Sequence, residues 1–234
     1  MKDRKSALLS AIIKEHISTG SAVASKKLVD NHTFSVSPAT IRNDMAALEK
    51  EGYIHQPHTS AGRIPTEKGW KHYIENFLRD IDLTEAEKKA LDSVIQKETG
   101  LAHDSVIKRV AKQLAEMSKE AVFVGLNSDS YYYTGLSNLF GQPEFQELDL
   151  VRHISSVVDT LDEVIKKMFD DFRDGTTVMV GSDNPFGNEC SSIVGTYENK
   201  SGQRGVFGIL GPMRMDYEQN LALIKHAQKL FINI

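Results

Sequence analysis

The side chains best suited to chemistry lie on one predicted helix that begins after Ser37. At 100° per residue, Ile41, Met45 and Leu48 fall on one side of this helix. The other side carries small and hydrogen-bonding residues in place of the Glu and Lys that usually cover a solvated face. Asn pairs bidentately with adenine, Arg with guanine, and Ala or a Thr methyl contacts the thymine methyl, so this face is typical of a helix that enters the DNA major groove. The predicted base-contact residues are Ala39, Thr40, Arg42, Asn43 and Ala46.

The elements around this helix predict a winged helix-turn-helix. Ser37 is a good N-cap and Pro38 suits the first helical position, while Gly52 is typical of the residue that ends a helix. A short strand at 53–56 and a return strand at Ile64 enclose a polar turn, which we interpret as the wing. Thr66 then caps a helix whose apolar residues can pack beneath it.

Two helices are expected before the recognition helix, at 3–19 and 24–30. In a helix-turn-helix the second of these crosses the DNA backbone, although lysines there are equally common as plain surface residues. Donors and cations on this helix, at the end of the recognition helix and in the wing are the predicted phosphate contacts: Ser25, Lys26, Lys27, Lys50, His58, Thr59, Ser60 and Arg63.

Charge is divided unevenly along the 234 residues. The whole chain carries a formal net charge of −4, yet residues 1–80 hold 12 Lys and Arg against 9 Asp and Glu, and residues 81–234 hold 16 against 23. The basic excess therefore coincides with the predicted DNA-binding segment. No apolar stretch is long enough to span a bilayer, and the N-terminal helix is amphipathic, so we expect no membrane association and a cytoplasmic protein.

The second half of the chain predicts an α+β fold. Residues 81–120 form a helical connector in this interpretation, with Val106, Val110, Leu114 and Met117 on one stripe. Such a stripe more commonly packs on its own domain, yet we favour a connector that also contributes to a dimer interface. Residues 121–234 alternate strands with helices, which predicts an antiparallel sheet with helices on one face. The expected strands are 121–126, 131–135, 176–181, 191–198 and 204–210, followed by a closing helix at 217–231.

No arrangement typical of an enzyme or a metal site is found. Cys190 is the only cysteine, and no general base lies at a recognisable spacing from it. No acidic residue or cysteine lies near His55 and His58 in the sequence to complete a zinc site. The glycines of GVFGILGP lack the continuation of a phosphate loop, so we interpret them as strand glycines. Asp216 is expected to cap the last helix with Arg214 paired to it. We predict no catalytic residues, no metal and no cofactor.

These segments resemble one known family. SPATIRNDMAALEKEGYIHQPHTSAGRIPTEKGWKHYI is similar to the N-terminal DNA-binding domain of the HrcA family, the heat-inducible transcription repressors of bacteria. GLSNLFGQPEF, NPFGNECSSIVGTY and GVFGILGPMRMDYEQNLALIKHA are similar, in order and spacing, to its C-terminal segments. The resemblance implies a GAF-like C-terminal domain and a dimer bound to an inverted repeat upstream of chaperone operons. It also implies a GroEL-type chaperonin as the partner that keeps the repressor active.

The resemblance also indicates that this chain lacks a segment in its middle, because full-length members carry further GAF-like strands and an inserted dimerisation domain before the GLSNLF segment. Domains are therefore expected at 1–80, 81–120 and 121–234, the last a reduced GAF-like domain. Two alternatives stay open. One is a ligand-sensing regulator of other promoters, with a pocket lined by Tyr131, Tyr132, Tyr133 and Phe207; the other is a winged-helix module that binds protein instead of DNA.

Overall fold

The computed structural model describes residues 3–30, 34–96, 103–127, 130–146, 161–171 and 175–233. The chain divides into two compact units, unit 1 at residues 1–79 and unit 2 at residues 80–234. The segment expected to be a connector, 81–120, belongs to unit 2. Within the described ranges, none of the helices has both the length and the apolar character needed to cross a bilayer.

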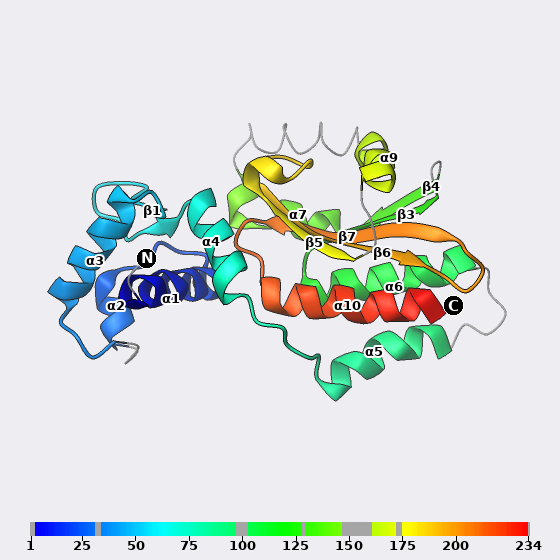
Figure 1. Ribbon diagram of the computed structural model, residues 1–234, viewed down its shortest axis with the longest axis horizontal. Helices are drawn as coiled ribbons and strands as arrows, with labels where there is room; N and C mark the ends of the chain where they lie inside the picture. The colour runs from blue at the N-terminus through cyan, green and yellow to red at the C-terminus, as the bar shows by residue number, and fades with distance from the viewer. Residues whose placement is uncertain are drawn as a thin grey trace. The chain divides into compact units, whose positions relative to one another are not determined.

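Unit 1 consists of three helices, a two-stranded hairpin and a fourth helix (Figure 1). Its centre is apolar, with Leu8, Ile12, Ile41 and Trp70 at 2% exposure or less. The hairpin pairs Ile54 with Pro65 and His55 with Ile64. The elements are α1 (Asp3–Thr19), α2 (Ser25–Asp30), α3 (Pro38–Lys50), β1 (Ile54–His55), β2 (Ile64–Pro65) and α4 (Glu67–Phe77).

Unit 2 is built on a continuous five-stranded antiparallel sheet with the order β4-β3-β7-β6-β5. Its longest ladder joins β6 to β7, from Cys190 opposite Pro212 to Glu198 opposite Arg204. Every predicted strand is present within two residues of its expected ends. The strands are β3 (Ala121–Asn127), β4 (Ser130–Thr134), β5 (Thr176–Val180), β6 (Cys190–Glu198) and β7 (Arg204–Pro212).

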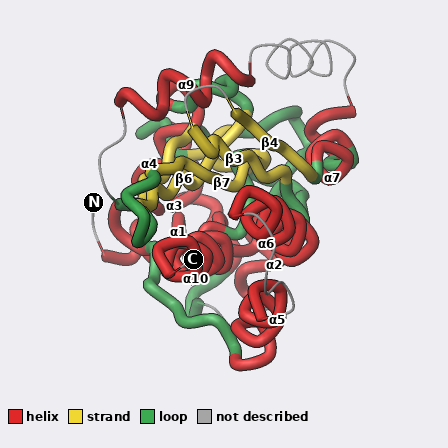
Figure 2. Tube along the Cα trace, turned by 90° about the vertical axis from the view of Figure 1, so that its right-hand side faces the viewer, coloured by secondary structure: helices red, strands yellow, loops and turns green. Residues whose placement is uncertain are grey.

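Helices cover both faces of this sheet, so the expectation that they lie on one face is wrong. Figures 1 and 2 show α6 and α10 against one face and α9 against the other. The cause is visible in the strands, because β3 and β7 are buried along nearly their whole length and need cover on each side. The helices of unit 2 are α5 (Glu85–Gln96), α6 (His103–Ser118), α7 (Leu136–Phe140), α9 (Leu161–Asp171) and α10 (Tyr217–Asn233), with 3-10 turns η1 (Pro143–Gln146) and η2 (Gly181–Asp183).

The apolar stripe of α6 is used inside unit 2. Val110 and Leu114 are fully buried and Val106 is 7% exposed, which accounts for the stripe by packing within its own domain. On the opposite face of the sheet, Leu161, Ile165 and Met168 of α9 join the core. The sequence also predicts a long helix after Pro143, and the part of it that carries Leu150, Ile154, Val157 and Val158 lies outside the described residues.

Two strand glycines let that face pack closely. A Cβ on Gly208 would lie 2.5 Å from the Phe123 ring and 2.8 Å from the carbonyl oxygen of Ile193. A Cβ on Gly125 would lie 2.4 Å from the ring of Phe169. Both approaches are shorter than a side chain tolerates, so these positions require glycine for packing. The glycines of GVFGILGP are therefore strand glycines, as the sequence indicates.

The pocket expected for a ligand sensor is not formed by the four aromatic residues named for it. Tyr132 and Phe207 both stand opposite Val124 and share one face of the sheet, whereas Tyr131 and Tyr133 alternate to the other face. Phe207 is fully buried and packs edge-on to Phe231 of α10. The period-two alternation of β4 separates the three tyrosines.

Arg214 and Asp216 do not pair with each other. Asp216 does accept a hydrogen bond from the backbone N–H of Gln219, at 3.1 Å, as an N-cap does. Arg214 instead contacts the carboxylate of Glu144 and donates to the Gln142 side chain at 2.7 Å. The sequence interpretation erred because Glu144 is seventy residues away along the chain and adjacent only after folding.

Glu120 lies at the start of β3 with 5% of its surface exposed. Its Oε2 has no hydrogen-bond partner among the described residues. Burial raises the pKa of this carboxyl to about 8; the charge of Arg214 acts to lower the pKa and that of Glu144 to raise it. In the folded protein the Glu120 carboxyl is therefore protonated and uncharged at pH values below about 8.

The raised pKa of Glu120 makes stability depend on pH. Between the ordinary pKa of 4.5 and about 8, the unfolded chain has released a proton that the folded chain retains. The free energy of unfolding should therefore fall as pH rises from 5 to 8, and Glu120→Gln should flatten that slope. Urea denaturation of both proteins at several pH values measures this dependence. The same dependence of unfolding free energy on pH in both proteins would contradict the raised pKa of Glu120.

Candidate nucleic-acid interface

The N-terminus of α3 is held by the expected cap. Ser37 accepts a hydrogen bond from the backbone N–H of Thr40 at 3.2 Å, and Pro38 occupies the first helical position. The Thr40 hydroxyl lies 3.0 Å from the Ser37 hydroxyl, so this candidate base-contact residue also takes part in the cap. Gly52 has a positive φ of 79° just after the helix, which suits glycine.

The inward side of α3 is the predicted apolar stripe together with one acid. Ile41 and Leu48 are fully buried and Met45 is 4% exposed. Asp44 is 8% exposed and accepts two hydrogen bonds from the Arg4 guanidinium of α1, at 2.8 and 3.0 Å. This bidentate pair joins α3 to α1 on the same side as the apolar stripe. Sequence reasoning missed it because nothing local links position 4 to position 44.

The outward side of α3 presents the candidate base-contact residues. Ala39, Arg42, Asn43 and Ala46 are all exposed, and Thr40 is half-buried. The side chains of Arg42 and Asn43 have no hydrogen bond or ion pair with any other residue that the structure describes. Lys50 is likewise exposed at the end of the same helix. One face of α3 therefore offers a planar cation and an amide beside small residues.

The wing is organised by backbone contacts at its base. Val23, which precedes α2, exchanges two hydrogen bonds of 2.9 Å with Arg63, so the hairpin has a third strand-like neighbour. A Cβ on Gly62 would lie 2.5 Å from the Val23 carbonyl group, and only glycine allows this approach. Gln56 donates to the carbonyl oxygens of Thr59 and Ala61, at 3.0 and 2.9 Å, which shapes the turn.

The candidate phosphate contacts differ in availability. His58, Thr59 and Ser60 are exposed at the wing tip, Lys26 is exposed on α2, and Ser25 beside it is half-buried. Lys27 pairs with Glu15 of α1 at 2.5 Å. The Arg63 guanidinium, 20% exposed, pairs with Glu49 of α3 at 3.0 Å. The charges of Lys27 and Arg63 are thus engaged within unit 1, where they hold α2 and the wing to neighbouring helices.

This arrangement defines the class of the N-terminal unit as a winged helix-turn-helix. In agreement, residues 12–67 match the model of a DeoR-like helix-turn-helix domain. Residues 62–221 match the model of the HrcA protein C terminal domain, which is more than half of the chain. The chain therefore belongs to the HrcA family, the family that its motifs resemble.

Relatives support this membership over different lengths. The chain is 43% identical over 122 residues to the heat-inducible transcription repressor HrcA of Kineococcus radiotolerans, covering 52% of this chain and 35% of the relative. It is 27% identical to the HrcA of Carboxydothermus hydrogenoformans, covering 99% of this chain and 97% of the relative. The chain spans about a third of the length of the relatives that it matches at over 40% identity.

The longer alignment locates the difference in length. It has 333 positions and the chain has 234 residues, so about 100 positions of the Carboxydothermus protein have no counterpart here. Because both chains are covered nearly end to end, these positions are internal, in agreement with the expected shorter middle.

One solved structure shares the fold of this chain. It is a hypothetical protein determined at 2.2 Å, and it is similar with a TM-score of 0.80 and 20% identity, over 99% of this chain and 98% of that one.

Gly62→Ala tests the base of the wing. The added methyl group would meet the Val23 backbone at 2.5 Å, which should lower the free energy of unfolding by about 1–3 kcal/mol. Ser60→Ala, in the same turn but exposed, should stay within about 0.5 kcal/mol of the parent. Urea unfolding of the three proteins measures the difference, and equal midpoints for Gly62→Ala and the parent would contradict the close contact.

Proposed function

We propose that this protein is a DNA-binding transcription repressor of the HrcA type that recognises an inverted repeat as a dimer. The observation that carries the proposal is the outward face of α3, where Arg42 and Asn43 are exposed and have no partner among the described residues. Family membership supports the same function, since the relatives carry the name heat-inducible transcription repressor. We propose that it acts in the cytoplasm on heat-shock genes, without enzymatic activity.

In this mechanism α3 supplies specificity and the rest of unit 1 supplies affinity. Arg42 and Asn43 read base edges in the major groove, and Ala39, Thr40 and Ala46 allow close approach and contact thymine methyl groups. Lys26, Lys50 and the wing tip contact phosphates, with strength that falls as salt rises. Two copies place their recognition helices one DNA turn, or a multiple of it, apart.

The regulatory part of the proposal concerns heat. A repressor that controls chaperone genes must lose activity when unfolded proteins accumulate, and a GroEL-type chaperonin that assists its folding would provide that link. The name of the relatives, heat-inducible transcription repressor, supports the response to heat. Comparing operator binding after refolding with and without chaperonin tests it directly.

The base contacts are tested by Arg42→Ala and Asn43→Ala on a duplex carrying the family's inverted repeat and on a scrambled duplex. Each bidentate contact contributes about 1–3 kcal/mol of discrimination, so each change should reduce preference for the repeat by roughly tenfold to a hundredfold. Both side chains are exposed, and folding should be unaffected. Lys14→Ala, an exposed cation on α1, is the matched control and should leave the preference unchanged. Retention of full preference in both variants would exclude readout by α3.

The phosphate contacts make a separate prediction about salt. Lys26→Ala and Lys50→Ala should each weaken binding to both duplexes alike and reduce the slope of log affinity against log salt by about 1. Fluorescence anisotropy over a salt series measures the slope, and size-exclusion chromatography with light scattering gives the number of chains bound per duplex. An unchanged slope would remove that lysine from the interface.

A further inference from the structure

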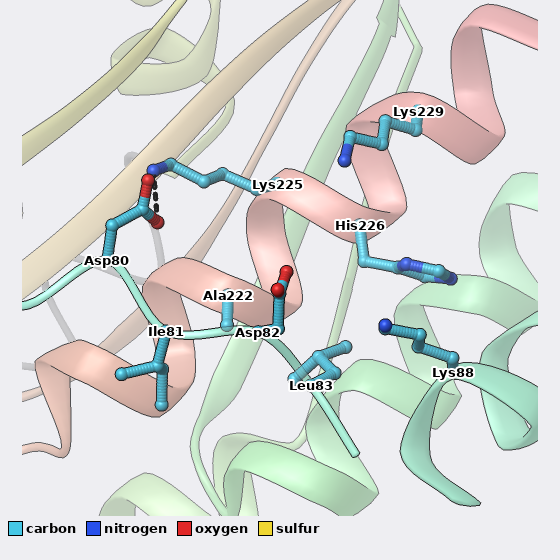
Figure 3. A pocket seen from close by; sticks show the side chains of 9 residues that line it. All are labelled: Asp80, Ile81, Asp82, Leu83, Lys88, Ala222, Lys225, His226 and Lys229. Atoms are coloured by element: carbon cyan, nitrogen blue, oxygen red, sulfur yellow. Dashed lines mark hydrogen bonds and ion pairs between the residues drawn. The ribbon is translucent and has the colours of Figure 1, made fainter. Parts of the chain in front are cut away.

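Unit 2 contains a cavity beside α10 that the proposed repressor function does not use (Figure 3). Its volume is about 460 Å³, within the range of small-molecule sites. One wall is the segment that opens unit 2, and the others are formed by residues of α5 and α10. The lining residues are Asp80, Ile81, Asp82, Leu83, Lys88, Ala222, Lys225, His226 and Lys229.

The lining combines an apolar floor with a cationic rim. Leu83 and Ala222 are each 5% exposed and Ile81 lies beside them. Three lysines extend around the cavity, Lys88 from α5 and Lys225 and Lys229 from α10 (Figure 3). An apolar surface adjoining several ammonium groups suits a ligand with an apolar body and a negatively charged head.

The cations are engaged to different degrees. Lys225 pairs with Asp80 at 2.6 Å and Lys88 with Glu85 at 3.1 Å, while His226 contacts Asp92 at 2.8 Å. The side chain of Lys229 has no hydrogen bond or ion pair with another described residue, so its ammonium group is available, while its backbone carbonyl accepts from the Asn233 side chain at 2.8 Å. The acids that face the lysines across the cavity, Asp80 and Asp82, both belong to the opening segment of unit 2.

We infer that this cavity binds a small organic anion, a phosphate or carboxylate attached to an apolar body. Lys229 and Lys225 hold the anionic group, and Leu83 and Ala222 contact the body. The anion competes with Asp80 for Lys225, because the two negative groups share one ammonium. Binding therefore exchanges a contact between α10 and the opening segment for a contact between α10 and the ligand.

This exchange has a consequence for regulation that rests on the proposed function. Residue 80 follows directly on unit 1 in the chain. A ligand that takes Lys225 from Asp80 alters the restraint on the segment that leads out of the DNA-binding unit. Operator affinity should then change when the cavity is filled. Ligand binding itself needs no DNA, so the two ideas are separable by experiment.

Isothermal titration calorimetry of the full chain with phenyl phosphate tests the site, with inorganic phosphate and benzyl alcohol as probes that hold only the charge or only the apolar body. Phenyl phosphate should bind more tightly than either. Lys229→Gln should weaken it about fivefold, as loss of one exposed charge contact does, and Asp80→Asn should strengthen it by a similar factor. Lys112→Gln, an exposed lysine on α6 away from the cavity, is the control and should have no effect.

The opposite responses to Lys229→Gln and Asp80→Asn distinguish the cavity from general attraction of anions. Equal affinity for phosphate and phenyl phosphate, or equal weakening by Lys229→Gln and Lys112→Gln, would overturn the inference. Operator binding is measured separately with and without phenyl phosphate. Anion binding with no operator binding would refute the repressor proposal but support the anion site. Operator binding with no anion binding would refute the anion site but support the repressor proposal.

Discussion

The orientation of α3 depends on the burial of its inner side, where Asp44 pairs with Arg4 of α1 beside an apolar stripe. An acid at 8% exposure requires a partner, and Arg4 provides two hydrogen bonds from α1. With Asp44 and the stripe of Ile41, Met45 and Leu48 turned inward, the helix can only present Arg42 and Asn43 outward. The face that we propose to read DNA is therefore a consequence of how the opposite face is buried.

The rest of unit 1 holds α2 and the wing by the same kind of contact. Lys27 reaches Glu15 of α1, and Arg63 reaches Glu49 of α3. These cations position elements, while Lys26, Lys50 and the polar wing tip keep their groups exposed. Lys27 and Arg63 thus hold elements of unit 1 together, and their role as phosphate contacts stays a prediction.

Unit 2 shows that the sheet does not require the segment that longer relatives carry. Five strands pair without interruption, and both faces are covered by helices of this chain. The core of unit 2 is closed although about 100 positions of the Carboxydothermus protein have no counterpart in this chain, and Phe123 and Phe207 lie on opposite faces of the sheet. The cavity between α5, α10 and the opening segment lies outside that core and is lined by charged groups.

The sequence by itself determined the features that rest on local chemistry. The caps at Ser37, Thr66 and Asp216 and the alternation along the strands all depend on neighbours within a few residues. The same local patterns predicted the winged helix. These predictions succeeded because backbone propensity and side-chain period act over short distances.

Only the tertiary structure decided which charged groups pair and which faces are covered. Arg214 pairs with Glu144 and not with Asp216, and Arg63 pairs with Glu49, since partners distant in sequence compete once the chain folds. The prediction of helices on one face of the sheet was wrong, because β3 and β7 are buried on both faces and long-range packing decides which helices cover them. The same holds for the lysine-lined cavity, whose walls are about 140 residues apart in the chain and meet only in the folded protein.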